Sequence, residues 1–264
     1  MNALRIYAIF LRQFYLNRRS VGRIFGFFYW TTLDLLLWGL IMIYISRLGT
    51  SNFAFAAVIL GTIILWNFLT RIQHGITVSF LEDTWTRNFI NLFSSPLTLA
   101  EYATGLVLTS LTTALISVIF MAGLAWFLFA YNIFQYGFML LPLITILFVF
   151  GWALGLFTTA IILRLGPSSE ILAWSIPALL GPISGVFYPI STLPVVVQKI
   201  AAFIPVSHVF EGMRQVVLTG SFDAGRLILA GVLSFVFFLA AYWFLVRSYR
   251  RVLRLGLFIR FMTD

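Results

Sequence analysis

The chain has 264 residues, of which 61% are hydrophobic and 9% are charged, and its formal net charge at pH 7 is +9. Because a soluble domain has about 25% charged residues, this composition excludes an ordinary soluble protein and indicates an integral membrane protein built as one helical unit. The sequence contains no cysteine, which excludes thiol catalysis and thiolate metal sites, and its arginines stand beside the apolar runs and at the two ends, a distribution that argues against nucleic-acid binding.

Residues 1–20 are expected to form an amphipathic helix that lies in the cytosolic membrane interface without crossing the bilayer. Arg5, Arg12 and Arg19 recur every seven residues and line up as one stripe, while large apolar side chains cover much of the remaining surface. Arginines of such a helix lie near anionic headgroups. A contact with a soluble partner is the alternative interpretation.

Two membrane spans are expected over residues 24–46 and 53–80, since each apolar run is long enough for a hydrocarbon core of about 30 Å. The first carries Asp34, the only acidic residue within the apolar body of a span. An intramembrane carboxylate is costly and suggests function, but an ion pair with an arginine or a neutral, hydrogen-bonded form explains it equally well. The second span turns polar at Arg71 and His74, which share a face. These two residues could line a substrate vestibule or hold an internal network.

Residues 81–95 form a polar island between two long apolar runs and are expected to carry a short helix. Aromatic side chains recur at helical spacing on one face, and polar side chains lie mainly on the other. Glu82 and Asp83 stand where the partial positive charge of a helix N-terminus favours anions. Such a helix suits docking to a partner, although a loop resting on lipid headgroups fits the pattern alone equally well. The candidate docking residues are Glu82, Asp83, Trp85, Arg87, Asn88, Phe89 and Phe93.

Residues 97–164 are expected to form the third and fourth spans. Thr98 and Glu101 have the spacing of a capping box, so a helix should begin between them. In the fourth span, Gly151 and Gly155 form a GxxxG pattern, which is a weak signal for close contact between two helices.

Residues 170–190 are expected to form a fifth span that is kinked or broken by prolines and glycines. A break exposed to lipid is not tolerated, so this break should be buried in protein or line a cavity. Residues 191–220 are too interrupted to span and are expected to form two short outer helices, which would be either a lid over the bundle or a surface hairpin without a gating role. Their expected boundary residues are Pro194 and Pro205 for the first helix, and Ser207 and Gly220 for the second. The candidate outer-gate residues are Pro189, Pro194, Pro205, His208, Glu211 and Arg214.

Residues 226–246 are expected to form the sixth span, and arginines continue at helical spacing into a tail over residues 247–264. Six spans place both ends of the chain on one side of the membrane. With this arrangement, 13 of the 17 basic residues fall on that side. The positive-inside rule therefore predicts that both ends and residues 81–95 are cytosolic.

No catalytic, cofactor or metal site is expected in this chain. A P-loop needs a Gly-Lys-Ser/Thr sequence to hold nucleotide phosphates, and no such sequence is present. His74 and His208 are the only histidines, which argues against a histidine-built metal site.

Together these features resemble the permease subunit of type-2 ABC exporters in bacteria. The resemblance covers nearly the whole chain, including its length, the six expected spans and the N-terminal interface helix. Its most specific parts are the E-D-x-W-x-x-N pattern at residues 82–88, the Ser95-Pro96 pair, and the segment GPISGVFYPISTLPVVVQKIAAFIPVSHVFEGMR at residues 181–214.

The resemblance implies an all-α integral membrane fold in a single domain over residues 1–264. Its parts would be six transmembrane helices, the interface helix, a cytosolic coupling helix at residues 82–93, and short outer re-entrant helices between the fifth and sixth spans. The coupling helix would fit a cleft in a separate ABC ATPase, and the loop at residues 164–170 would be a further contact. Two ATPase copies would bind ATP and Mg, with none bound by this chain.

The resemblance also implies that two permease copies, expected to be a homodimer, pack in the bacterial inner membrane, mainly through the first and fifth spans. The expected cargo is an amphipathic or lipid-linked compound, either a drug-like hydrophobic molecule or a polysaccharide. Aromatic residues, 18% of the chain, could stack on sugar rings, but most should simply face membrane lipids. The alternatives are a proton-coupled secondary transporter, for which Asp34 alone is thin support, and a non-transporting membrane scaffold.

Overall fold

A computed structural model describes residues 1–47, 53–221 and 223–255 of the chain. Over these residues the chain is helical and contains no β-strand. This confirms the expected all-α class.

The first three helices match the expected interface helix and first two spans. Helix α1 (Ala3–Arg19) begins where the side chain of Asn2 accepts a hydrogen bond of 2.9 Å from the backbone N–H of Leu4. Helices α2 (Val21–Arg47) and α3 (Phe53–Trp85) follow. Helix α3 extends five residues beyond the expected end of the second span.

A short helix, α4 (Phe89–Ser94), precedes α5 (Leu99–Phe129). The expected capping box is present at the start of α5, because Glu101 N–H donates to Thr98 Oγ1 (3.2 Å) and Thr98 N–H donates to Glu101 Oε2 (3.0 Å). A 3₁₀ helix, η1 (Ile133–Met139), leads into α6 (Leu140–Leu165), and a short 3₁₀ turn, η2, follows α6.

Helix α7 (Leu172–Ile183) is shorter than the span expected over residues 170–190. Its 12 residues extend about 18 Å, against about 30 Å for a hydrocarbon core. The interior proline Pro177 has no N–H, so the carbonyl of Ala173, four residues earlier, lacks its helical donor. Gln73 Nε2 of α3 donates to that carbonyl instead (3.2 Å). Because Gln73 and Ala173 are both buried, this interruption lies inside the protein, as the sequence predicts.

After α7 come η3 (Ile190–Thr192), α8 (Val195–Ala201) and α9 (Pro205–Thr219), and the axes of α8 and α9 differ by 98°. Pro194 precedes α8 and Gly220 ends α9 with a left-handed φ of 64°, both as predicted. The other two boundary predictions are wrong. Pro205 does not end the first helix but is the first residue of α9, the position where its fixed φ and missing N–H are best tolerated. Ser207 is therefore a buried residue inside α9 and not its cap.

Helix α10 (Ala224–Arg254) is capped by Asp223, whose Oδ1 accepts from the backbone N–H of Arg226 (3.0 Å). The sixth span and the arginine-rich segment after it therefore form one continuous helix. Residues 256–264 of the expected tail lie outside the described part of the chain.

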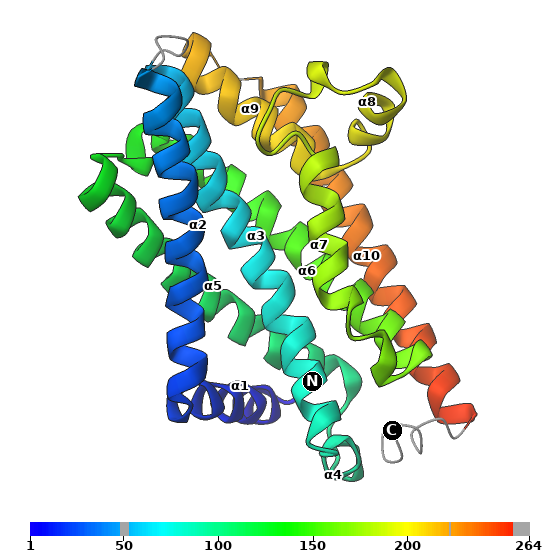
Figure 1. Ribbon diagram of the computed structural model, residues 1–264. Coiled ribbons are helices and arrows are strands. Elements are labelled where there is room, and N and C mark those ends of the chain that lie inside the picture. Colours follow the sequence, from blue (N-terminus) through cyan, green and yellow to red (C-terminus); the bar gives the residue numbers. More distant parts are fainter. Residues whose placement is uncertain (48–52, 222, 256–264) are drawn as a thin grey trace.

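Figure 1 shows how these elements are arranged. Helices α2, α3, α5, α6 and α10 run side by side between two ends of the molecule, and α7 extends over part of that distance. Helices α1 and α4 and the last turn of α10 lie at one end, which we call the α4 end. Helix α8 and the first turn of α10 lie at the other, the α8 end.

By length and composition, four of the described helical segments can cross a membrane, and up to five if α8 and α9 count as one bent span. The four are α2, α5, η1 with α6, and α10. Of the six expected spans, α3 and α7 fall outside this set. Helix α7 has only 12 residues, and the side chains of the first residues of α3 lie outside the described part of the structure.

Helix α3 is the centre of the bundle. A continuous series of its apolar side chains is almost fully buried, packed mainly against α5 and α6. The series is Leu60, Ile63, Ile64, Leu65, Phe68, Leu69, Ile72, Ile76, Phe80 and Leu81.

The GxxxG pattern of α6 forms the contact with α3. A Cβ atom built on Gly151 would lie 2.9 Å from Ile72 Cγ2, and one built on Gly155 would lie 2.9 Å from Ile76 Cβ. Both distances are too short for real carbon contacts, so only glycine permits this approach. The expected close helix contact is confirmed.

Replacing Gly155 should therefore disrupt the bundle. We expect Gly155→Leu to lower the free energy of unfolding by about 1–3 kcal/mol, because added atoms in a packed interior force the helices apart. The matched control is Gly123→Leu on α5, where a Cβ would meet nothing within 4 Å. Heating the purified variants in detergent and following loss of the folded species measures the effect; equal melting of the two variants would contradict the packing argument.

Candidate functional site

The polar residues of the α4 end are held by a buried carboxylate. Asp83, near the end of α3, has no exposed surface. One of its oxygens accepts from Arg12 Nη2 of α1, and the other accepts from the Tyr102 hydroxyl of α5 (2.7 Å). Burial alone would lower the pKa of Arg12, but the hydrogen bond and negative charge of Asp83 more than offset this and raise it. The carboxylate thus joins three helices.

A second carboxylate fixes the beginning of α1. Glu101 accepts from the backbone N–H of Asn2 (2.7 Å), and Arg5 lies 3.6 Å from its other oxygen. Arg5 also donates to the backbone carbonyl of Pro96. Arg5 and Arg12 of the predicted stripe therefore pair with protein carboxylates.

Glu82 also makes an internal ion pair. Its Oε2 accepts from Arg23 Nη1 at the start of α2 (3.0 Å). The two adjacent acids therefore tie α1 and α2 to the end of α3. Sequence reasoning missed these roles, because the arginine partners lie 71 and 59 residues away along the chain.

The prediction that a separate helix begins near Glu82 is wrong. Helix α3 continues through Glu82 and Asp83 to Trp85, so both acids lie in its last turns and not near a helix N-terminus. The chain then turns at Arg87, which has a left-handed φ of 55°, and α4 begins at Phe89. The physical reason is that the two carboxylates find arginine partners at this point, which outweighs their unfavourable position at the negative end of the helix dipole.

The turn between α3 and α4 presents its side chains to the surface. Trp85 is 52% exposed, and its Nε1 donates to Glu170 Oε2 in the loop after α6 (2.8 Å). Arg87 is also exposed, and Asn88 is half-buried. The side chains of Phe89 and Phe93 lie outside the described part of the structure. We call the exposed residues Trp85, Thr86, Arg87 and Asn91, together with Glu170, the turn surface.

A polar groove of about 620 Å³ opens between α2, α3, α5 and α7. Its lining combines both signs of charge with aromatic rings and includes Arg23, Trp30, Asp34, Asn67, Arg71, His74 and Trp174.

The intramembrane candidates meet in this groove. Asn67 Nδ2 donates to Asp34 Oδ2 (3.4 Å). Arg71 donates to Thr31 Oγ1 (2.8 Å) and stacks over a phenylalanine ring of α2. Asp34 and Arg71, both of which the structure describes, do not form an ion pair. Two structural interpretations of Asp34 were open, a hydrogen bond and an ion pair with an arginine. The structure shows the hydrogen bond, from Asn67, and no ion pair between Asp34 and Arg71. His74 shares the face of Arg71, as predicted, with its ring 4.7 Å from that of Trp174.

At the α8 end, two outer-gate candidates hold the loop that follows α7. Buried Arg214 of α9 donates to Glu211 Oε1 (2.9 Å), to the carbonyl of Gly185 and to that of Val186 (3.0 Å). Glu211 Oε1 also accepts from the backbone N–H of Ile190 (2.8 Å). The Arg214–Glu211 pair therefore satisfies backbone groups that the end of α7 leaves without helical partners.

The remaining outer-gate candidates lie at the starts of helices or in a contact between α8 and α9. Pro189 precedes η3, Pro194 precedes α8, and Pro205 is the first residue of α9. His208 Nε2 lies 2.8 Å from the carbonyl of Ala202, which links α9 to the end of α8. A further contact that the sequence did not reveal is the ring of Phe187, which stacks on Trp38 of α2 with centroids 4.3 Å apart.

Among the described residues, no group of three or more histidine or acidic side chains is placed to hold a metal ion. The α4 end presents exposed aromatic and charged side chains next to its buried ion pairs.

The chain was compared with known protein families. The model of the ABC-2 type transporter family matches residues 6–218. No curated protein matches the chain.

The buried carboxylate can be tested by Asp83→Asn. We expect the amides of α1 to exchange with deuterium about thirtyfold faster, because Arg12 loses its counter-charge, a change of about 2 kcal/mol. The matched control is Glu82→Gln, which removes the neighbouring, partly exposed carboxylate and should affect α1 far less. Unchanged exchange in α1 of Asp83→Asn would refute its clamping role.

The loop after α7 can be tested by Arg214→Leu. Loss of the guanidinium leaves the carbonyls of Gly185 and Val186 without this donor and removes the counter-charge of Glu211, so we expect a loss of about 3 kcal/mol in unfolding free energy. The control is Arg226→Leu, which breaks the exposed Arg226–Asp223 pair and should cost less than about 1 kcal/mol. The melting temperatures of the two variants measure the difference. An equal decrease in both would rule out a special role for Arg214.

Proposed function

The chain belongs to the ABC-2 type transporter family, and from this premise we propose that it is the permease subunit of an ATP-driven exporter. It is the membrane component of such a transporter and crosses the membrane several times. A membrane domain of this family lacks the ATPase domain, so nucleotide is bound by a separate ATPase.

The turn surface is proposed as the docking site for that ATPase. The observation that carries this proposal is an exposed tryptophan beside a buried ionic clamp: Trp85 is 52% exposed, and Asp83, two residues earlier, is fully buried and joined to α1 and α5. An exposed aromatic residue on a rigid support is typical of the residues that dominate protein interfaces. Of the residues expected to dock, Trp85 and Arg87 are accessible, whereas Glu82 and Asp83 support the surface from within.

The same geometry suggests how force reaches the membrane helices. Helix α3 runs without interruption into the turn surface, so movement of Trp85 is delivered directly to the central helix of the bundle. The Asp83 contacts carry it to α1 and α5 as well. This supports a mechanism in which ATP closes two ATPase copies and the docked turns move with them.

We propose that the α4 end faces the cytosol and that six segments cross the membrane: α2, α3, α5, α6, α10, and α7 together with the loop that follows it. The support is the distribution of basic residues, which gather in α1, at the start of α2 and in the last turns of α10. Cytosolic segments carry such an excess of arginine. The protein would then lie in a bacterial inner membrane with both ends of this sequence inside.

Two copies of the chain would form the transport path as a homodimer. Helices α2 and α7 flank the polar groove, and each also presents exposed apolar side chains, including Trp30 and Leu37 on α2 and Trp174 and Leu179 on α7. A second copy packed on these faces would enclose the groove. Its mixed polar and aromatic lining suits an amphipathic or lipid-linked substrate, either a hydrophobic compound or a polysaccharide. The loop held by Arg214 would then close the outer end of the path.

Trp85→Asp tests the docking site. With the chain co-expressed with its ATPase, we expect about thirtyfold weaker association, since interface tryptophans commonly contribute about 2 kcal/mol or more. Co-purification of the ATPase and the ATP hydrolysis rate of the complex measure this.

Trp85→Phe keeps the ring but loses the hydrogen bond to Glu170, and should retain most of the ATPase. Phe203→Asp, which adds a charge at an exposed aromatic residue near the α8 end, controls for general disturbance of the bundle. Full association and normal hydrolysis with Trp85→Asp would contradict the proposed docking.

A further inference from the structure

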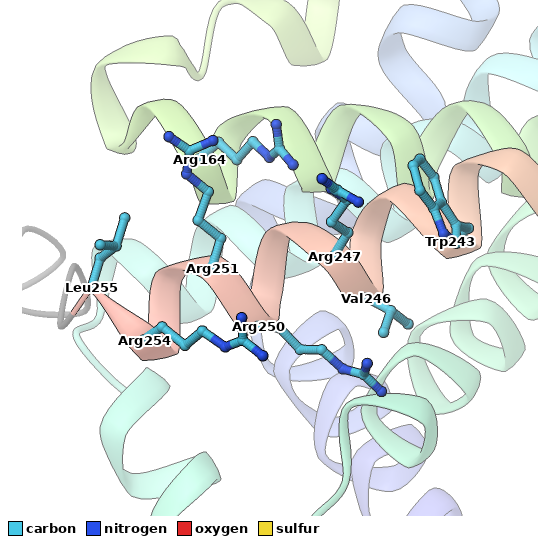
Figure 2. A pocket seen from close by; sticks show the side chains of 8 residues that line it. All are labelled: Arg164, Trp243, Val246, Arg247, Arg250, Arg251, Arg254 and Leu255. Atoms are coloured by element: carbon cyan, nitrogen blue, oxygen red, sulfur yellow. The ribbon is translucent and has the colours of Figure 1, made fainter.

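The last turns of α10 form a basic pocket that the proposed function does not use. A cavity of about 570 Å³ is lined by Arg164 at the end of α6 and by Trp243, Arg247, Arg250, Arg251 and Arg254 of α10. We call this the arginine pocket. Figure 2 shows these arginines along one stretch of α10, with Arg247 and Arg251 extending toward the helix that carries Arg164.

The arginine pocket has no carboxylate to balance it within the described part of the chain. The ion pairs found there use Arg5, Arg12, Arg23, Arg214 and Arg226. The four arginines of α10 follow at intervals of three, one and three residues, which brings their like charges together on the helix surface. These like charges repel one another, and a bound anion would relieve the repulsion.

Other contacts orient part of the cluster without neutralising it. Arg164 Nε donates to Ser248 Oγ (2.8 Å), and its guanidinium lies 4.6 Å from the centre of the Phe244 ring. Arg247 lies 5.4 Å from the centre of the Trp243 ring. These contacts orient the guanidinium groups of Arg164 and Arg247 and leave most of their N–H donors available for a ligand.

The position of the arginine pocket along α10 matches the depth of lipid headgroups. About 20 helical residues cross a hydrocarbon core of about 30 Å, and counting from Ala224 this distance ends at Trp243. Trp243 is 61% exposed, as is typical of tryptophan at a membrane interface. Arg247 then lies at headgroup level, and Arg254 lies about 10 Å further out, roughly one Debye length.

The surface that leads to the arginine pocket is apolar. Val232, Phe235, Val236 and Leu239 of α10 are exposed on the preceding turns. A ligand that fills the pocket and also covers this surface needs both negative charge and hydrocarbon chains. Basic pockets of this kind on the cytosolic side of membrane helices bind anionic lipid headgroups.

We propose that the arginine pocket binds the phosphate headgroup of an anionic phospholipid from the cytosolic leaflet, with its acyl chains along α10. Five guanidinium groups favour a lipid with two phosphates over one with a single phosphate, since each phosphate accepts paired hydrogen bonds from arginine. The inference rests on the proposed orientation of the α4 end and not on ATPase docking.

The test uses the full chain purified in detergent without the ATPase, so failure of ATPase docking does not affect it. The protein is titrated with cardiolipin, phosphatidylglycerol and phosphatidylcholine, and native mass spectrometry measures the bound lipid. We expect affinity to fall in that order. Arg250→Gln with Arg251→Gln should weaken cardiolipin binding about thirtyfold, because each arginine near a membrane surface contributes about fivefold.

The matched control is Arg18→Gln with Arg19→Gln, which removes the same charge from exposed residues of α1 at the same end. Neither arginine lines the arginine pocket, so this pair should leave cardiolipin affinity within about twofold of the original chain. Arg254→Gln alone provides a milder variant, with a loss of about fivefold.

Equal binding of cardiolipin and phosphatidylcholine, or an equal loss in the α1 control, would overturn the proposal. A double α10 variant that keeps its cardiolipin affinity but no longer co-purifies with the ATPase would also overturn it, and would assign the arginine pocket to protein docking.

Discussion

The α4 end depends on one buried carboxylate. Asp83 has no access to solvent, and its two oxygens are satisfied by a guanidinium from α1 and a hydroxyl from α5. A buried charge without partners would be strongly unfavourable, so these helices can separate only at a high cost. The turn surface, which includes Trp85, lies next to this fixed group. A rigid support of this kind suits the proposed docking site.

The same principle operates where the helices are interrupted. Pro177 leaves the carbonyl of Ala173 in α7 without its helical donor, and the side-chain amide of Gln73 in α3 donates a hydrogen bond to it. At the end of α7, Arg214 supplies donors to Gly185 and Val186. Because an unsatisfied backbone group is costly in a membrane, these donors from other helices stabilise α7 at Pro177 and at its end.

The sequence pattern predicted those structural elements that are determined by residues close together in the chain. The capping box of Thr98 and Glu101, the close approach at Gly155 and the existence of α1 all follow from residues near one another in the sequence. The end of α3 could not be found in this way, since the carboxylates of Glu82 and Asp83 are stabilised by distant arginines that spacing does not reveal. Docking remains a proposal for the same reason: local pattern cannot tell an internal ion pair from an exposed binding residue.

The unbroken course of α3 has a mechanical consequence. One of its close contacts, with Gly151 and Gly155 of α6, lies at Ile72 and Ile76. Measured from midway between these two residues, Trp85 is about 17 Å away and the first turn of the helix about 32 Å, at 1.5 Å per residue. A rod that tilts about such a fulcrum has a short arm and a long one. If α3 moved in this way, a displacement at the Trp85 arm would be roughly doubled at the opposite tip.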